Sequence, residues 1–125
     1  MKTTSKVFVY GTLRKAQVNH HLLASATYVG LYNTQPHYKM FHLRGYPGVV
    51  KGGGTSIEGE IYQVDALTMK KLDRLEGYPH TYTRELIPSP WGMVWIYLYR
   101  GRVEGRTTIS TGVWCDEIYW RRWSR

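Results

Sequence analysis

The sequence contains a single cysteine in 125 residues. Cys115 cannot close a disulfide within the chain, which excludes the class of small secreted proteins that are held together by cross-links. No neighbouring feature would activate its thiol, so we expect a passive side chain and not a nucleophile. The low cysteine content favours a reducing, cytoplasmic location.

Long hydrophobic runs are also absent. The apolar stretches span only a few residues, whereas a membrane-spanning helix needs about 20. Residues 1–6 lead directly into a strand-like run and not into the apolar segment of a secretory signal. We therefore expect neither membrane insertion nor export.

The sequence has no pattern of metal ligands and no phosphate-binding loop. His20 and His21 are adjacent, so their side chains would point apart on a helix or a strand, and the other histidines offer no suitable spacing. The glycine run at residues 52–54 lacks the Gly-Lys-Ser/Thr ending of a phosphate loop. We expect no metal and no cofactor.

Acidic residues are missing from the first 57 positions, which carry seven basic residues. Residues 58–99 hold six acidic and four basic residues, and residues 100–125 hold six arginines and three acids, for a net charge of +8. Every candidate catalytic carboxylate therefore lies after residue 57. The positive first half should attract anions, but charge does not choose between a small carboxylate, a phosphate and a nucleic-acid backbone.

The chain is large enough for one core, since 42% of its residues are hydrophobic and 14% are aromatic. We expect a single domain over residues 1–125, with its core at about 6–100 and an aromatic, basic C-terminal extension at 101–125. The extension contains Trp114, Tyr119, Trp120 and Trp123 together with Arg121, Arg122 and Arg125. These aromatic side chains would cap the core, or alternatively stack on nucleic-acid bases.

Runs of β-branched and aromatic residues predict strands at residues 6–10, 28–32, 37–43, 57–64, 82–87 and 93–99. Residues 33–36 and 44–48 have turn composition, and residues 51–55 form a glycine-rich link. One or two helical turns are expected at residues 18–23. A longer helix is predicted at residues 66–76, because Asp65 is suited to cap its start and Gly77 to end it. These elements indicate an α+β fold with a curled, mostly antiparallel sheet.

The first predicted strand ends in Tyr10-Gly11-Thr12-Leu13. Successive backbone N–H groups after a strand can point into one concavity and bind an anion, and Gly11 would let a ligand approach closely. Arg14 and Lys15 would strengthen the positive potential there. The same Gly-Thr pair also occurs in ordinary strand-ending turns, so the pattern alone leaves both interpretations open.

Glu76 is the last residue of the predicted helix. It follows Leu72 by four positions, and with Leu67 and Leu75 on the same face it would lie at the edge of the apolar surface. The negative end of the helix dipole and partial burial would both raise the pKa of this carboxyl. Such a group can accept and return a proton near neutral pH. The alternative is a solvated glutamate that pairs with a nearby Lys or Arg.

Four segments together resemble one family. They are Tyr10-Gly11-Thr12-Leu13-Arg14 followed by Asn19-His20, Gly59-Glu60-Ile61-Tyr62, Leu72-Asp73-Arg74-Leu75-Glu76-Gly77-Tyr78, and Tyr82-Thr83-Arg84. In order and spacing they resemble the gamma-glutamylcyclotransferase-like superfamily, in its AIG2-like branch allied to gamma-glutamylamine cyclotransferase. The resemblance covers residues 6 to about 100. It implies a small mixed, mostly antiparallel β-barrel flanked by helices.

The resemblance also implies a cofactor-free enzyme, an amide-cleaving and cyclising transferase of lyase type. It would convert a gamma-glutamyl amide to 5-oxoproline and a free amine, with Glu76 as the catalytic acid and base. The residues implied to bind the substrate are Tyr10, Gly11, Thr12, Leu13, Arg14 and Tyr82. The expected partner is this small molecule, with no membrane, and the protein would be a monomer or a homodimer.

Two features depart from the family pattern. Ala16 stands where the family usually has glycine, and the segment from Gly101 onward has no counterpart in that pattern. Two other functions therefore stay open beside the enzyme. One is a non-catalytic module that binds a small anion in the same pocket, and the other is a nucleic-acid-binding protein that uses the basic first half and the Trp/Arg-rich extension.

Overall fold

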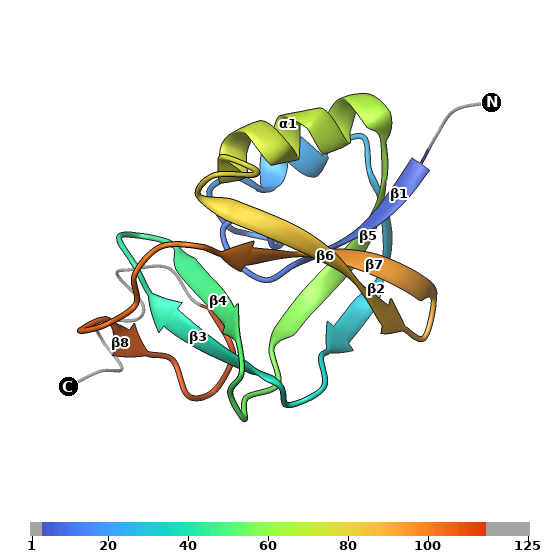
Figure 1. Ribbon diagram of the computed structural model, residues 1–125. Coiled ribbons are helices and arrows are strands. Elements are labelled where there is room, and N and C mark those ends of the chain that lie inside the picture. Colours follow the sequence, from blue (N-terminus) through green and yellow to red (C-terminus); the bar gives the residue numbers. More distant parts are fainter. Residues whose placement is uncertain (1–3, 115–125) are drawn as a thin grey trace.

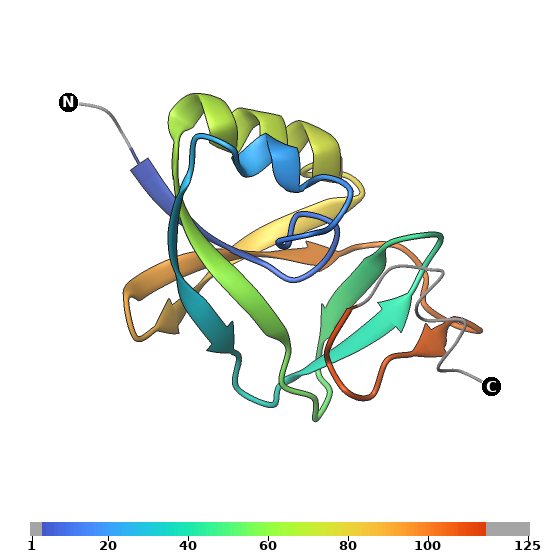
Figure 2. The same cartoon turned by 180° about the vertical axis from the view of Figure 1, so that it is seen from behind.

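The computed structural model describes residues 4–114, which form three layers (Figure 1). A five-stranded sheet lies in the middle, a helical layer covers one of its faces, and a three-stranded sheet lies against the other. The same arrangement is seen from behind in Figure 2. Cys115, Tyr119, Trp120, Trp123 and the last three arginines lie outside the described residues.

The five-stranded sheet has the order β2-β5-β1-β7-β6. Its strands are β1 (Thr4–Val9), β2 (Thr27–Asn33), β5 (Glu58–Asp65), β6 (Tyr82–Ser89) and β7 (Gly92–Tyr99). β1 pairs with β5 antiparallel and with β7 parallel, and the other pairs in this sheet are antiparallel. The predicted mixed, mostly antiparallel α+β fold is confirmed.

The second sheet has the order β4-β3-β8, with strands β3 (Tyr38–His42), β4 (Pro47–Lys51) and β8 (Thr107–Thr108). The predicted turn at residues 44–48 and link at 51–55 were wrong where they overlap β4, at Pro47, Gly48 and Lys51, and hold at residues 44–46 and 52–54. Proline is tolerated as the first residue of an edge strand, and β4 is such a strand. β8 is too short to produce a recognisable pattern.

The strand pairing of the described residues does not close into a ring, so the predicted barrel is not confirmed. The two edges of the large sheet nevertheless meet through side chains. The Trp91 ring at the β6–β7 turn covers Gly30 of β2 so closely that a Cβ there would overlap it. The Tyr32 hydroxyl donates a hydrogen bond of 3.2 Å to the Pro88 carbonyl. The sheet is therefore curled, with β2 and the β6–β7 turn in contact.

The helix α1 (Ala66–Glu76) begins and ends as predicted. The Asp65 side chain accepts a hydrogen bond of 2.8 Å from the Thr68 backbone N–H, and Gly77 ends the helix in the left-handed conformation with φ of 64°.

The predicted apolar face of α1 was only partly right. Leu72 is fully buried, but Leu67 and Leu75 are 63% and 41% exposed. Five positions at about 3.6 residues per turn put Leu67 on nearly the opposite side from Leu72. The buried face instead contains Thr68, Met69 and Leu72. Glu76 lies four residues after Leu72 and so belongs at the edge of this face, as predicted.

Two cores fill the spaces between the layers. β7 contributes to both, because its side chains alternate: Val94, Ile96 and Leu98 face the three-stranded sheet, whereas Trp95 and Tyr97 face the helical layer. That layer is made of α1 and the 3-10 turn η1 (His20–Leu23), which lies in the predicted short helical segment. Trp114 is buried in the core between the two sheets. This confirms the predicted capping role for this one residue of the extension.

No helix in residues 4–114 combines the length and the apolar character that crossing a membrane requires.

Candidate active site

A cavity of about 390 Å³ opens between the segment after β1, the end of α1, and strands β4, β6 and β7. This volume falls in the range of about 300–1,000 Å³ that is typical of small-molecule sites. The cavity is lined by Phe8, Val9, Tyr10, Gly11, Thr12, Leu13, Val18, Asn19, Gly45, Tyr46, Pro47, Arg74, Leu75, Glu76, Gly77, Thr81, Tyr82 and Tyr97. The structure thus brings the glycine-containing turn and the helix-terminal glutamate to one hollow.

The turn after β1 is folded tightly at Gly11. A Cβ at this position would come within 2.8 Å of the Pro47 ring, so a larger residue would not fit without movement. The Asn19 backbone N–H donates to the Thr12 carbonyl at 2.8 Å, and the Asn19 side-chain amide donates to the Thr12 hydroxyl at 2.9 Å. Asn19 therefore ties the end of this turn back to its start.

The backbone donors of the turn are available to a ligand. Outside the helices and strands of residues 4–114, backbone hydrogen bonds use the carbonyls of Gly11 and Thr12, but not the N–H groups of Gly11, Thr12 or Leu13. Three successive N–H groups at the wall of a cavity are a ready anion-binding feature.

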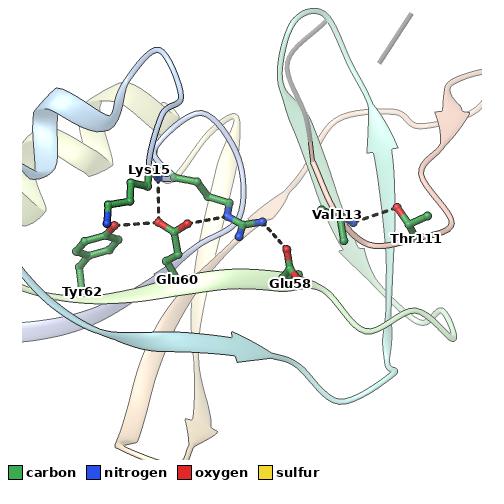
Figure 3. A network of polar contacts seen from close by, with 7 residues as sticks. Lys15, Glu58, Glu60, Tyr62, Thr111 and Val113 are labelled. Carbon is green, nitrogen blue, oxygen red and sulfur yellow. Dashed lines mark hydrogen bonds and ion pairs between the residues drawn. The ribbon is translucent and has the colours of Figure 1, made fainter. Parts of the chain in front are cut away.

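A buried carboxylate, Glu60 of β5, holds the segment that follows this turn (Figure 3). Glu60 accepts hydrogen bonds from the Lys15 backbone N–H at 2.9 Å, from the Tyr62 hydroxyl at 2.9 Å and from the Arg14 guanidinium at 3.1 Å. Burial alone would raise the pKa of Glu60, but these hydrogen bonds hold it below its ordinary value. Glu60 is therefore ionised at neutral pH and anchors the turn.

Arg14 does not line the cavity. Its guanidinium pairs with Glu60 and also with Glu58 at 3.0 Å, so these two acids of β5 hold the turn. The predicted contact between Arg14 and substrate finds no support in this placement.

Ala16 adopts the left-handed backbone conformation, with φ of 70°. This is the position at which the family usually has glycine, and a residue with a Cβ is less stable in this region by about 1–2 kcal/mol. The turn of this chain therefore keeps a backbone shape that suits glycine, although the residue is alanine.

Glu76 is half-buried at the wall of the cavity. Among residues 4–114, no side chain or backbone group hydrogen-bonds to its carboxyl. Burial raises its pKa to about 7, in the direction predicted from its place at the edge of the apolar face. The carboxyl is therefore present in both protonation states near neutral pH.

Three tyrosines around Glu76 have their hydroxyl groups committed to internal hydrogen bonds. Tyr10 donates to the Tyr97 carbonyl at 2.7 Å, Tyr82 donates to the Pro47 carbonyl at 2.6 Å, and Tyr97 donates to the Asp73 carboxylate at 2.7 Å. Burial, with a smaller contribution from the charge of Glu76, raises the pKa of each hydroxyl well above its ordinary value. Tyr10 and Tyr82 are therefore neutral walls.

A second ion pair fixes the last turns of α1. Asp73 accepts two hydrogen bonds from Arg84 of β6, at 2.9 and 3.2 Å. The Arg84 guanidinium also lies over the Tyr78 and Trp95 rings, 4.5 and 4.2 Å from their centroids. Because Asp73 precedes Glu76 by three residues, these contacts hold the segment that carries the cavity glutamate.

Sequence reasoning missed several lining residues. Tyr97 could have been found from the alternation of β7, which sends it to the same side as Trp95 and hence toward the helix. Tyr46 was assigned to a turn, and Arg74 was noted only as part of a motif. Asn19 was noted as part of a motif, but its bonds to Thr12 follow only from the folded turn.

No group of three His, Cys, Asp or Glu side chains suited to a metal ion is found in the part of the chain that the structure describes. Among the lining residues, Glu76 is the one carboxylic acid, and Arg74 is the one basic side chain.

The family model described as "Gamma-glutamyl cyclotransferase, AIG2-like" matches residues 7–116. The match extends beyond residue 100, where the resemblance was expected to end. A similar protein is the gamma-glutamylcyclotransferase family protein ytfP of Citrobacter rodentium, which is 41% identical over 111 residues, or 89% of this chain and 96% of that protein.

Two solved structures show the same fold. The protein ytfP of Escherichia coli is 36% identical, with a TM-score of 0.73 over 90% of this chain and 98% of that one. The uncharacterised protein PH0828 of Pyrococcus horikoshii is 25% identical, with a TM-score of 0.79 over 94% of this chain and 95% of that one. Both similarities extend over nearly the whole domain.

Proposed function

The chain belongs to the AIG2-like gamma-glutamyl cyclotransferase family, and from this premise we propose that it cyclises a gamma-glutamyl amide to 5-oxoproline and a free amine. One observation carries the proposal: a carboxyl with a pKa of about 7 and three successive unused backbone N–H groups line the same cavity. An intramolecular cyclisation needs these two features, a group that moves protons and a site that fixes an amino acid.

The N–H groups of Gly11, Thr12 and Leu13 would bind the α-carboxylate of the substrate. This contact holds one end of the glutamyl group, so that its α-nitrogen is kept near the γ-carbonyl carbon. Holding two reacting groups in a near-attack arrangement can lower a barrier by several kcal/mol. The neutral rings of Tyr10 and Tyr82 would shape the walls and exclude water.

Glu76 would move the proton between the two nitrogens. The α-ammonium group has a pKa of about 8, so the ionised carboxylate must first remove its proton. The freed amine then attacks the γ-carbonyl carbon, and a new C–N bond closes the five-membered ring. Protonated Glu76 returns the proton to the amide nitrogen as the old C–N bond breaks and the amine leaves. The ring nitrogen still carries two hydrogens, and it gives its extra proton to the Glu76 carboxylate, which passes it to the departing amine. The carboxylate is regenerated, with no covalent enzyme intermediate and no co-reactant.

The test is to incubate the protein with a broad panel of gamma-glutamyl amines and peptides and to measure 5-oxoproline. We expect release by the wild type and a loss of at least about 100-fold for Glu76→Gln, in the range typical of a general acid–base group. Glu85→Gln is the matched control, because the Glu85 side chain is 45% exposed and lies outside the cavity. Equal, negligible release by wild type and Glu76→Gln would overturn the catalytic role.

The same samples separate the alternative functions. A ligand that binds tightly and is recovered unchanged, with an affinity altered by Glu76→Gln, would favour a module that binds without turnover. Oligonucleotide affinity that falls steeply with salt would favour nucleic-acid binding instead.

A further inference from the structure

A second hollow of about 320 Å³ adjoins the candidate active site. Its lining residues are Thr12, Ala16, Gln17, Val18, Gly45 and Trp114. Thr12, Val18 and Gly45 also line the first cavity, so the two hollows share a boundary. Since Thr12 belongs to the turn with the free N–H groups, the second hollow begins beside the expected position of the glutamyl group.

None of the described residues that line this second hollow carries an ionisable side chain. Its walls are uncharged, with the polar side chains of Thr12 and Gln17 beside the apolar side chains of Ala16, Val18 and Trp114. Trp114 is 4% exposed and packs against the His42 ring, with 5.4 Å between the ring centroids, so this wall is fixed in place. Val18 at the shared boundary is 74% exposed, so its apolar side chain is accessible to a ligand.

Exposed apolar side chains also surround the mouth of the first cavity. Tyr46 and Leu75 line it together with Val18, and all three are among the exposed large hydrophobic residues of the described chain. Apolar groups gathered at the rim of a cavity mark a surface that is covered when a ligand binds.

The charges around the two hollows disfavour a cationic group on the leaving part of the substrate. The chain carries a net charge of +8, and Arg74 is a lining residue of the first cavity. The nearby acids Glu58 and Glu60 already pair with Arg14. Glu76 must exchange its own proton during the proposed reaction and cannot serve as a permanent counter-ion.

We propose that the leaving amine of the substrate carries an uncharged, apolar or aromatic substituent, which lies in the second hollow between Val18 and Trp114. This inference rests on the proposed function and names the substrate class for it. The reaction is unchanged: the amide C–N bond breaks, and the amine departs with the proton that Glu76 received from the α-ammonium group.

Three substrates with the same glutamyl half test the inference: gamma-glutamyl phenylethylamide, gamma-glutamyl ethylamide and gamma-glutamyl putrescine. Release of 5-oxoproline gives kcat/KM for each. We expect the aromatic amide to exceed the cationic one by at least about tenfold, with the ethylamide in between, because filling an apolar pocket by a few carbons changes specificity by this order.

The variant Val18→Glu places a carboxylate at the boundary of the two hollows. Because Val18 is largely exposed, the fold should tolerate the change, and thermal unfolding followed by circular dichroism checks this. We expect the ratio of kcat/KM for the aromatic and cationic amides to fall by at least about tenfold, since burial of an apolar ring beside a carboxylate is unfavourable and an ammonium group gains a partner. Leu67→Glu is the control, because Leu67 is exposed on α1 and lines neither hollow. It should leave the ratio unchanged.

The outcomes separate this inference from the proposed function. Turnover with equal or reversed preference in the wild type, or a ratio that a folded Val18→Glu protein leaves unchanged, would overturn the inference alone. Absence of 5-oxoproline from all three amides and from the broad panel would overturn the proposed function, and this inference with it.

Discussion

Glu76 has a pKa of about 7 against an ordinary value of 4.5, because the fold buries it. The folded state therefore binds the proton of Glu76 more tightly than the unfolded state. Below pH 4.5 the carboxyl is protonated in both states, and burial has little electrostatic cost. As the pH rises from 4.5 to about 7, the unfolded state loses this proton first, and stability falls. Above about pH 7 the carboxyl is ionised in both states, and the loss of stability caused by its burial has reached its full value.

Removing this charge should stabilise the protein while it abolishes activity. We expect Glu76→Gln to raise the free energy of unfolding at pH 8 by up to about 3 kcal/mol, from about 1.4 kcal/mol per pKa unit. At pH 4 the wild type and Glu76→Gln should have nearly equal free energies of unfolding. Urea unfolding at both pH values measures it. A stability gain that is equal at pH 4 and pH 8 would show that ionisation of Glu76 is not its cause.

The same pKa should appear in the rate. If Glu76 is the base, kcat/KM should fall below pH 7 by about tenfold per pH unit, as the carboxylate becomes protonated. A pH profile of 5-oxoproline release between pH 5 and 8 measures this acidic limb. A limb centred near pH 4.5 would assign the base to a carboxyl that the fold does not bury.

Ala16 allows a separate test of backbone strain. We expect Ala16→Gly to stabilise the protein by about 0.5–1 kcal/mol, since glycine adopts positive φ without a Cβ penalty but is more flexible when unfolded. Ala24 has an ordinary helical conformation, with φ of −57°, so Ala24→Gly should destabilise by about 1 kcal/mol. Urea unfolding compares the two variants. Destabilisation by both would mean that the left-handed conformation of Ala16 is not strained.

At the scale of elements, the segment between β1 and η1 depends on an anchor in β5. We expect Glu60→Gln to destabilise the protein by about 1–3 kcal/mol, because the part-buried hydrogen bonds from Arg14 and the Lys15 backbone lose a charged acceptor. KM for the gamma-glutamyl substrate should rise more than kcat falls, since the anion-binding turn loosens and Glu76 is untouched. Glu85→Gln removes an exposed pair with Lys51 and should change stability by less than about 1 kcal/mol. If Glu60→Gln leaves KM unchanged, the hydrogen bonds of Glu60 do not contribute to substrate binding.

The elements that carry local signals were predictable. Asp65 caps the start of α1 with its side chain, and Gly77 ends the helix with a positive φ. Both roles can be predicted from the residue types. β4 was missed because proline and glycine at its start resemble a turn, and its strand conformation comes from pairing with β3. The contacts of Arg14 were also out of reach, because its acidic partners lie 44 and 46 residues away in the sequence.

At the scale of the whole molecule, the predicted convergence of two segments on one hollow is confirmed by the lining of the cavity. Their catalytic and binding roles stay predictions. The second hollow could not be predicted, because its fixed wall, Trp114, comes from the extension that the family pattern did not cover. The contact between the two sheet edges could not be predicted either, because the local sequence around Gly30 or Trp91 does not indicate which residue it contacts.

That edge contact should contribute to the stability of the whole domain. We expect Gly30→Ala to destabilise by at least about 1 kcal/mol, because the added methyl group overlaps the Trp91 ring. Gly54→Ala is the control, since a Cβ at Gly54 meets no atom within 4 Å. In a Trp91→Ala background the cost of Gly30→Ala should disappear. If Gly30→Ala still destabilises the Trp91→Ala protein, the loss of stability arises within β2 and not from overlap with the Trp91 ring.

The parallel pairing of β1 with β7 governs when the cavity can exist during synthesis. β1 is translated first, yet it occupies the middle of its sheet and gains its second neighbour only after β7 has emerged. Tyr10 and the Tyr97 carbonyl to which it donates are 87 residues apart. A nascent or truncated chain that stops before β7 therefore has no complete pocket and exposes an unpaired edge of its central strand, which favours aggregation. Activity should appear only in products that include β7, and chains terminated before it should be substrates for chaperones and proteases.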